Sequence, residues 1–239
     1  MKKIGLIGGI TPESTILYYR ILNKLNSDYI GKPHSAEVVI NSFDFGEIAQ
    51  LQKENRWDLL DIKMAETGQN LEDAGASCII ICANTMHLCI DAVRNAVKIP
   101  VIHIAEATSK SIVKKQLKKV ALLGTKYTME KDFFTDILKS FGIETIIPEI
   151  EEREIIHAVI YDELSVGNIN PISKEKYLTI IKELIKKGAE GIILGCTEIP
   201  LLIQQNDVSV PVFDTTEIHA KAAFKYSVNN QQQQQQQQQ

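Results

Sequence analysis

Two stretches of this chain share one pattern, and together they constrain the fold more than any other feature. Residues 75–86 read G-A-S-C-I-I-I-C-A-N-T-M, and residues 188–199 read G-A-E-G-I-I-L-G-C-T-E-I. Aligned without a gap on their Gly-Ala starts, each is typical of a helix end, a short apolar strand and a polar loop. The alignment puts Cys196 in register with Ala83, whereas Cys82 stands one position earlier.

A second pair of segments supports an internal duplication. Residues 2–8 resemble residues 118–124, at an offset of 116 residues, and the first pair has an offset of 113. Because both order and spacing agree, the sequence indicates two related halves of about 110 residues each.

Apolar runs predict four strands in each half, and several are apolar at nearly every position, as in parallel strands covered on both faces. Thr11 and Pro12 suit the N-cap and first position of a helix, and Ser173 can cap another. A further helix over residues 57–74 is expected to end at Gly75. The predicted strands are residues 4–7, 37–41, 78–82, 101–104, 120–123, 144–147, 191–194 and 210–213.

Strand and helix alternate throughout, which predicts an α/β fold with two similar doubly wound parallel-sheet lobes. We expect an N-terminal lobe of residues 1–104 plus about 212–228 and a C-terminal lobe of residues 105–211, because the last strand and helix have no counterpart late in the first half. Duplicated α/β halves commonly bind a ligand between them, at the carboxyl ends of the strands. Residues 229–239 end in glutamines with nothing apolar to bury, and we expect a disordered polyglutamine tail.

Composition narrows the classes of partner. The chain has 239 residues, 44% of them hydrophobic, and a net charge of −4 without a basic block, which argues against nucleic-acid and membrane partners. The apolar run at the start is too short for a signal peptide, and no run approaches the roughly 18 apolar residues of a membrane span. A cytoplasmic location follows as the expectation, with Cys78, Cys82, Cys89 and Cys196 as free thiols.

The loop after the second apolar run offers acid/base chemistry. A cysteine such as Cys196, placed where a helix begins, can be stabilised as a thiolate, although an isolated cysteine after a strand is usually a small buried residue. Asn84 and Thr85 in the first copy, with Thr197 and Glu198 in the second, either cap the following helix or bind a ligand. Gln52 is a further polar residue near a predicted strand end.

Other candidate sites are weaker. The turn at residues 5–11, which contains Gly9 and Ile10, lacks the third glycine of a dinucleotide fingerprint, so we interpret it as a close approach to a small ligand. Cys78 and Cys82 lie about 13 Å apart if they share one strand, too far for one zinc ion. We therefore expect neither a dinucleotide site nor a metal site. His87 and His219 either point toward a ligand or bond to neighbouring groups in a helix turn.

These motifs closely resemble the paired signatures of the aspartate/glutamate racemase family. The likeness rests on residues 79–87 and 192–199 and extends to residues 5–9, 13–15, 122–125 and 212–215. It covers nearly the whole chain except the glutamine tail. The second signature is specific, and the first is looser.

The resemblance implies two similar α/β lobes with the active site between them, no cofactor and an amino-acid substrate, and it is compatible with a homodimer. It also implies a two-base mechanism, in which one thiolate removes the α-proton and an opposite thiol delivers another. Cys196 matches the second cysteine of the family. The first usually stands directly before Asn-Thr, where this chain has Ala83, and strand alternation should turn Cys82 to the opposite face.

The hypothesis from the sequence is a cofactor-independent amino-acid racemase that uses Cys196, with Cys82 as a second candidate thiol. Gly9, Ile10, Gln52, Ala83, Asn84, Thr85, Thr197 and Glu198 are expected to bind the substrate. The alternatives are a single-cysteine decarboxylase or isomerase relative, and a non-catalytic amino-acid-binding derivative. Ala83 motivates both, since alanine can neither take nor give a proton.

Overall fold

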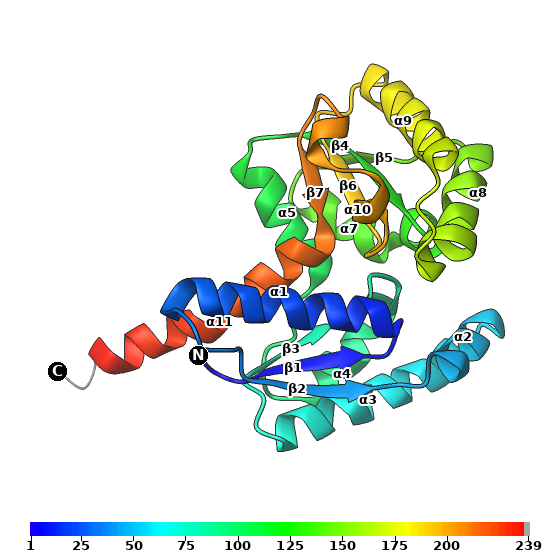
Figure 1. The fold of residues 1–239 in the computed structure, drawn as a ribbon. Coiled ribbons are helices and arrows are strands. Elements are labelled where there is room, and N and C mark those ends of the chain that lie inside the picture. Colours follow the sequence, from blue (N-terminus) through cyan, green and yellow to red (C-terminus); the bar gives the residue numbers. More distant parts are fainter. Residues whose placement is uncertain (237–239) are drawn as a thin grey trace. The chain divides into compact units, whose positions relative to one another are not determined.

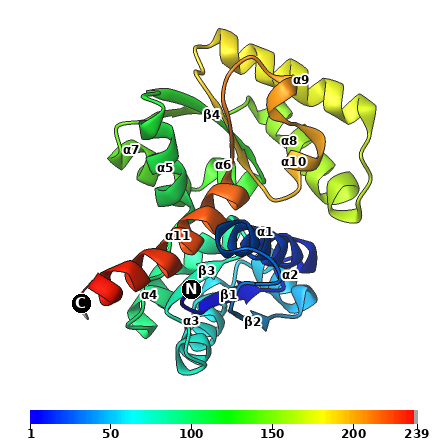
Figure 2. The ribbon, with the colours of Figure 1, turned by 60° about the vertical axis from the view of Figure 1, so that its left-hand side comes forward.

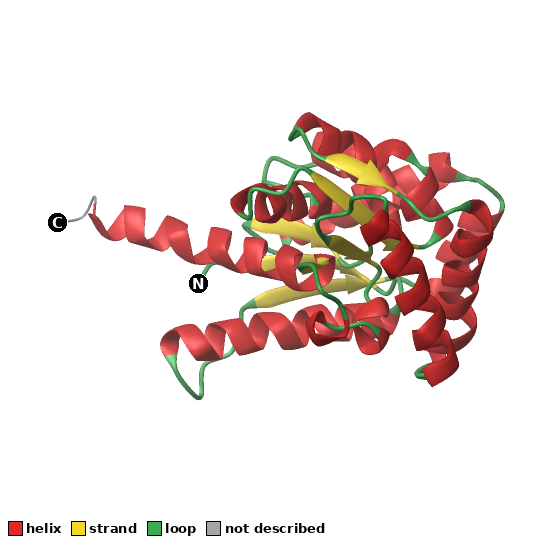
Figure 3. Ribbon diagram, turned by 90° about the horizontal axis from the view of Figure 1, so that it is seen from above, coloured by secondary structure: helices red, strands yellow, loops and turns green. Residues whose placement is uncertain are grey.

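The computed structural model describes residues 1–236, which fall into two compact units. Unit 1 contains Met1–Ile104 together with the chain from His219 onward, and unit 2 contains Ala105–Ile218. Each unit is a parallel sheet flanked by helices, as Figures 1 and 3 show. The predicted α/β class with two doubly wound lobes is confirmed at this level.

Unit 1 is built on three parallel strands in the order β2-β1-β3. They are β1 (Ile4–Gly8), β2 (Val38–Ser42) and β3 (Cys78–Ile81). All residues of β1 and β3 are buried, as expected for strands covered on both faces. Because the three strands are parallel, their carboxyl ends lie at one edge of the sheet.

Helices cover both faces of the unit 1 sheet (Figure 1). One face packs against α1 (Pro12–Ile30) and residues 220–228 of α11 (Thr215–Gln236), with Leu6 and Ile80 on the strands. The other face, with Ile7 and Ile81, packs against α2 (Phe45–Lys53), α3 (Trp57–Asp73) and α4 (Ile90–Ala96).

Local signals set several helix ends of unit 1 as predicted. The side chain of Thr11 accepts the backbone N–H of Ser14 at the start of α1, and Pro12 occupies the first helical position. After α3, Gly75 has a φ of 84°, a left-handed conformation that glycine adopts readily.

Unit 2 repeats this arrangement with one additional strand. Its parallel sheet has the order β5-β4-β6-β7. The strands are β4 (Lys119–Gly124), β5 (Glu144–Ile146), β6 (Ile192–Gly195) and β7 (Val212–Asp214). The order β5-β4-β6 matches β2-β1-β3, so the duplication seen in the sequence is also a duplication of topology.

The helices of unit 2 lie on both sides of its sheet (Figure 2). One apolar cluster joins β4 and β6 to α8 (Ile150–Ala158) and α9 (Pro171–Lys186), whereas α5 (Ile104–Lys114) and α7 (Asp132–Ser140) lie along the other side. Shorter helical turns are η1 (Thr85–Cys89) in unit 1 and α6 (Lys126–Glu130), the π-helical η2 (Val159–Glu163), η3 (Leu164–Val166), α10 (Ile199–Leu202) and η4 (Gln205–Asp207) in unit 2.

The predicted strand at residues 101–104 is wrong in extent. Only Val101 forms a bridge, to Ile79 of β3, and Ile104 already begins α5. This bridge occupies the position beside β3 that β7 occupies beside β6, and each is followed by a helix. The last strand and helix thus have a counterpart in the first half after all.

The predicted boundary at residue 212 is also corrected. β7 pairs in parallel with β6, through Ile193 and Phe213 among others, so residues 212–218 belong to unit 2. The chain passes between the units at residues 104–105 and again within α11 at residues 218–219. Backbone pairing of β7 decides this boundary.

A further expectation differs from the structure. Asn170, rather than Ser173, caps α9, because its side chain accepts the N–H of Ile172 and Pro171 takes the first position. The last helix, α11, ends at Gln236, and the disorder expected of the tail at residues 229–239 stays a prediction. Residues 237–239 lie outside the described part of the chain.

Among the described residues, no helix combines the length and apolar character needed to cross a membrane.

Candidate active site

The pairing of strands fixes which residues of the two units are equivalent. Ile7 of β1 is paired with Ile81 of β3, and Leu123 of β4 is paired with Leu194 of β6. Ile7 and Leu123 are themselves equivalent in the duplication. Two residues beyond these pairs, Ala83 follows β3 and Cys196 follows β6, so the sheet register agrees with the register of the sequence motif.

The turn after β1 requires glycine. Gly9 has a φ of 79°, and a Cβ atom built on it would lie 2.3 Å from the carbonyl oxygen of Phe43. The Gly9 N–H donates to the Thr15 hydroxyl at 2.8 Å, which ties the turn to α1. Ile10 is buried in the apolar cluster that also contains Ala83.

The predicted binding residues of unit 1 follow β1 and β3 or lie on α2. Ala83 is 9% exposed, Asn84 is buried and Thr85 is partly exposed at the start of η1. Gln52 donates from its side-chain amide to the sulfur of Met86 at 3.2 Å, which brings α2 next to η1. Among the buried hydrophobic residues that pack in one cluster with Ala83, Cys89 is the only one with a titratable side chain.

Cys82 lies on the opposite face of the sheet from Ala83, as strand alternation predicts. It packs with Leu6, Tyr18 and Ile80 beneath α1 and is fully buried. Burial raises the pKa of its thiol far above the ordinary value, which favours the uncharged form. This environment is that of a structural cysteine and argues against Cys82 as an acid/base group.

Three buried histidines lie together in unit 1. The ring centroid of His87 is 4.9 Å from that of His103 and 5.3 Å from that of His219. His219 donates from Nε2 to the carbonyl of Ile102 at 2.7 Å, and its Nδ1 accepts the Tyr18 hydroxyl at 2.8 Å. For His219, the reading as a histidine bonded to neighbouring groups therefore fits the structure better than the reading as a ligand-facing side chain.

His87 links the end of β3 to the start of α5 within unit 1. Its Nδ1 donates to the carbonyl of Ala83 at 2.9 Å, and its Nε2 accepts the N–H of Ile104 at 3.2 Å. A backbone carbonyl can only accept a hydrogen bond, and a backbone N–H can only donate one. The Nδ1 atom therefore carries the proton, the Nε2 atom does not, and His87 is neutral. His87 thus holds the backbone of the strand exit rather than presenting its ring to a ligand.

The histidine cluster predicts acid sensitivity of unit 1. Burial lowers the pKa of His219 to about 4, and burial, Arg94 and His219 lower that of His103 to about 3. Below the unfolded pKa of about 6.5 the unfolded state binds more protons, so stability falls as the pH falls. Between pH 7 and 4.5, the free energy of unfolding should drop by about 2 kcal/mol through His219 alone. Urea unfolding at several pH values measures this.

A matched variant isolates the contribution of His219. His219→Gln keeps one donor and one acceptor but does not titrate, so it should make the pH dependence above pH 4.5 less steep, leaving the contribution of His103; this range lies above most carboxylate titrations. An unchanged slope in a folded His219→Gln protein would contradict the assignment.

The exit of β6 in unit 2 carries the chemistry that the first exit lacks. Cys196 is partly exposed, and its Sγ–H donates to Oε2 of Glu198 at 2.8 Å. The Thr197 hydroxyl donates to the same oxygen at 2.7 Å. Burial first, and then the negative charge and hydrogen bond of Glu198, raise the pKa of the Cys196 thiol well above its ordinary value.

Glycine allows the exits of β4 and β6 to lie close together. Gly124 is paired with Gly195, and a Cβ on Gly195 would approach the carbonyl oxygen of Leu123 to 2.9 Å. Thr125, directly after β4, caps α6 by accepting the N–H of Thr128. The loop of Cys196 therefore adjoins the start of α6 at one edge of the sheet.

Tyr161 belongs to the surroundings of Cys196 and was missed in the sequence. Burial and then the charge of Cys196 raise the pKa of Tyr161 to about 12, and its ring lies 4.6 Å from that of His157. Tyr161 stands on the π-helical turn η2, and such turns are frequent at functional sites. No pattern in the sequence distinguishes this turn from an ordinary helix end.

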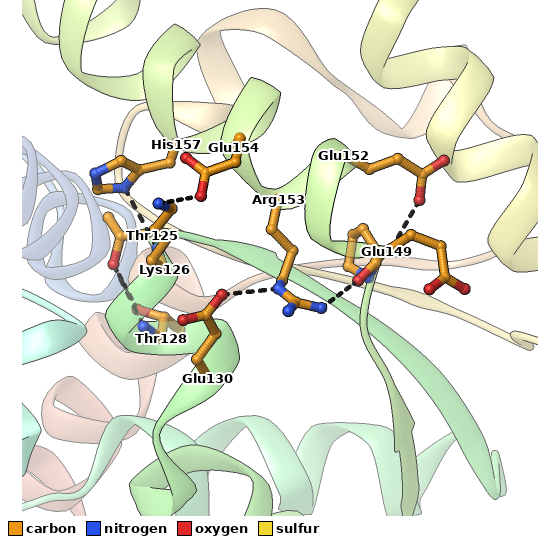
Figure 4. A network of polar contacts seen from close by, with 10 residues as sticks. Thr125, Lys126, Thr128, Glu130, Glu149, Glu152, Arg153, Glu154 and His157 are labelled. Atoms are coloured by element: carbon orange, nitrogen blue, oxygen red, sulfur yellow. Dashed lines mark hydrogen bonds and ion pairs between the residues drawn. The ribbon is translucent and has the colours of Figure 1, made fainter.

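A small pocket of about 220 Å³ lies beside α6 and is lined by Lys126, Tyr127, Glu130, Lys131 and His157. Figure 4 shows how charges around it are paired: Lys126 with Glu154, and Arg153 with Glu130. Because Lys126 already has a carboxylate partner, we assign the pocket no ligand.

Within residues 1–236, no group of three histidine, cysteine, aspartate or glutamate side chains is arranged to hold a metal ion.

Comparison with known proteins agrees with the fold and the motifs. The broad specificity amino-acid racemase RacX of Bacillus subtilis (strain 168) is 24% identical over 227 residues, which cover 92% of this chain and 95% of that protein. Two solved structures are more similar in sequence. A protein described as a "putative Asp/Glu Racemase" from Yersinia pestis has 44% identity and a TM-score of 0.91, covering 95% of this chain and 100% of its own.

The second is an aspartate racemase homologue from Pyrococcus horikoshii OT3, with 40% identity and a TM-score of 0.85. The alignment covers 95% of this chain and 99% of that one. A family model described as Asp/Glu/Hydantoin racemase matches residues 7–223, that is, both units. The chain belongs to the Asp/Glu/Hydantoin racemase family.

Proposed function

We propose that this protein is a cofactor-independent amino-acid racemase that acts on aspartate, glutamate or a related α-amino acid. The observation that carries the proposal is Cys196, a partly exposed thiol at a strand exit, hydrogen-bonded to a carboxylate, in a chain of this family. The names of the similar proteins from Yersinia pestis and Pyrococcus horikoshii support the choice of substrate.

In this proposal Cys196 exchanges the α-proton of the substrate. Asn84, Thr85 and Thr197 hold the carboxylate and amino groups, and the turn at Gly9 and Ile10 and the amide of Gln52 lie nearby. The homodimer and the cytoplasmic location expected from the sequence are retained as parts of the proposal.

Ala83 makes the chemistry asymmetric. The position equivalent to Cys196 carries a methyl group, so the second proton has to come from water or another side chain. Proton exchange with solvent should therefore be faster than inversion of the α-carbon.

The experiment is incubation with L- and D-aspartate in heavy water, followed by NMR for exchange and chiral chromatography for inversion. Exchange accompanied by slower inversion is the expected result. Exchange without any inversion would instead favour the single-cysteine decarboxylase or isomerase alternative, which Ala83 motivates.

Binding without exchange, measured by calorimetry across aspartate, glutamate and related amino acids, would favour a non-catalytic amino-acid-binding derivative. That outcome would contradict the proposed racemase.

A further inference from the structure

Buried histidines hold the backbone where the chain leaves unit 1, at residues 104–105, and where it returns, at residues 218–219. The N–H of Ile104 donates to Nε2 of His87 at 3.2 Å. His219, the first residue after the return, donates from Nε2 to the carbonyl of Ile102 at 2.7 Å. Both histidines are buried, so water does not compete for these bonds. Within unit 1, the two connections are thus fastened to each other.

The first connection is held by a side chain from a distant segment. Ile104 is the first residue of α5, and the N–H groups of a first helical turn have no acceptor within the helix. One acceptor here is His87 on η1, 17 residues earlier. Before α11, the corresponding bonds are local: Asp214 accepts the N–H groups of Thr216 and Glu217. Unlike a local cap, the bond from His87 ties the start of α5 to η1.

The other nitrogen of His87 holds the strand exit after β3. Its Nδ1 donates to the carbonyl of Ala83 at 2.9 Å, and residues 83–85 are part of the proposed substrate site. One rigid ring therefore joins this strand exit to the connection at residues 104–105. A displacement of either end has to break a buried hydrogen bond or move the other end with it.

The ring keeps both bonds near neutral pH. Burial first, and then the neighbouring His103 and His219, lower the pKa of His87 well below its ordinary value, which favours the neutral form that both bonds require.

We propose that His87 is a positioning residue, which couples the strand exit at residues 83–85 to the connection at residues 104–105, so that a bound amino acid orders both. The inference rests on the proposed function, because it takes the ligand to be an amino acid held by this strand exit. His87 is 1% exposed and acts through backbone atoms, so it is not a catalytic residue.

The test measures amide hydrogen exchange of Ile104 by NMR, with and without aspartate at a concentration that calorimetry shows to be saturating. Ordering of residues 83–85 by the ligand also holds the ring of His87. Exchange of the Ile104 N–H in the wild-type protein should therefore slow by about tenfold, the effect of about one hydrogen bond.

Two variants remove the hydrogen bonds of His87 one at a time. In His87→Asn the amide takes the place of Nδ1, so it can donate to Ala83 but does not reach Ile104. In His87→Gln the amide oxygen takes the place of Nε2 and can accept from Ile104, but the carbonyl of Ala83 loses this donor. Without ligand, the Ile104 N–H should exchange about tenfold faster in His87→Asn and at nearly the wild-type rate in His87→Gln. Both variants should lose the slowing by aspartate.

His34→Asn is the matched control. His34 is exposed in the segment between α1 and β2, so its replacement should change neither the exchange of Ile104 nor the effect of aspartate. Urea unfolding verifies that each variant is folded.

Loss of the aspartate effect in both His87 variants supports the proposal, because a merely structural role would lower stability without uncoupling the ligand from Ile104. Slowing that persists in both folded variants overturns it, as does a wild-type protein that binds aspartate without slowing this amide. If the wild-type protein binds no tested amino acid, the racemase proposal fails. The ligand-free rates then still decide on His87: faster Ile104 exchange in His87→Asn supports its hold on the connection, and an unchanged rate overturns it.

Discussion

Replacing Cys196 with alanine is expected to lower the rate of α-proton exchange from aspartate or glutamate by about 10³-fold. Positioned acid/base groups typically contribute 10²–10⁴-fold, and in the described residues of unit 2 Cys196 is the only cysteine. The fold should tolerate the change, because the side chain is partly exposed and leaves little unfilled core. Loss of the α-proton signal by NMR in heavy water measures the rate.

Cys196→Ser is the matched control for this variant. A serine hydroxyl can still donate to Glu198, but it is a far weaker acid than a thiol, so exchange should stay close to that of Cys196→Ala. Exchange at more than a tenth of the wild-type rate in folded Cys196→Ala would eliminate this cysteine as the acid/base group.

The second large effect is a gain. Ala83→Cys is expected to raise the rate of inversion by about 100-fold, because it places a thiol at the strand exit equivalent to that of Cys196. Sheet pairing supports the choice of position, since Ala83 stands two residues after Ile81 as Cys196 does after Leu194. Chiral chromatography of L- and D-aspartate after equal incubation gives the ratio of inversion to exchange.

Ala83→Ser tests whether the chemistry of the thiol, rather than the larger size of the side chain, raises the rate of inversion. The hydroxyl is similar in volume but does not form the anion near neutral pH, so inversion should remain at the wild-type level. Equal inversion by Ala83→Cys and wild type, with both proteins folded, would show that position 83 does not face the substrate.

Much of the fold follows from local patterns in the sequence. Strands such as β1 and β6 are short apolar runs bounded by glycine, and α1 begins at a Thr-Pro pair that satisfies the first turn. The duplicated motif also predicts the shared strand order, because similar segments in the same order along the chain form similar strands and helices.

Other features depend on contacts between distant segments. Residues 101–104 are as apolar as a strand, but α5 begins at Ile104, and a single bridge remains. Residues 212–218 join unit 2 because β7 finds its partner in β6. Such pairings are decided by which neighbours lie within hydrogen-bonding distance, which local propensity does not specify.

Some features of the candidate site likewise follow from the sequence, and others follow only from the tertiary structure. The sequence by itself determined the family resemblance, the two strand exits and the absence of a thiol at position 83, since these follow from residue identity and register. Only the tertiary structure decided that Cys82 is buried beneath α1, that His87 holds the carbonyl of Ala83, and that Glu198 accepts a hydrogen bond from the Cys196 thiol. The reason is physical: the pKa of a side chain and its hydrogen-bond partners depend on burial and on nearby charges, which folding brings together.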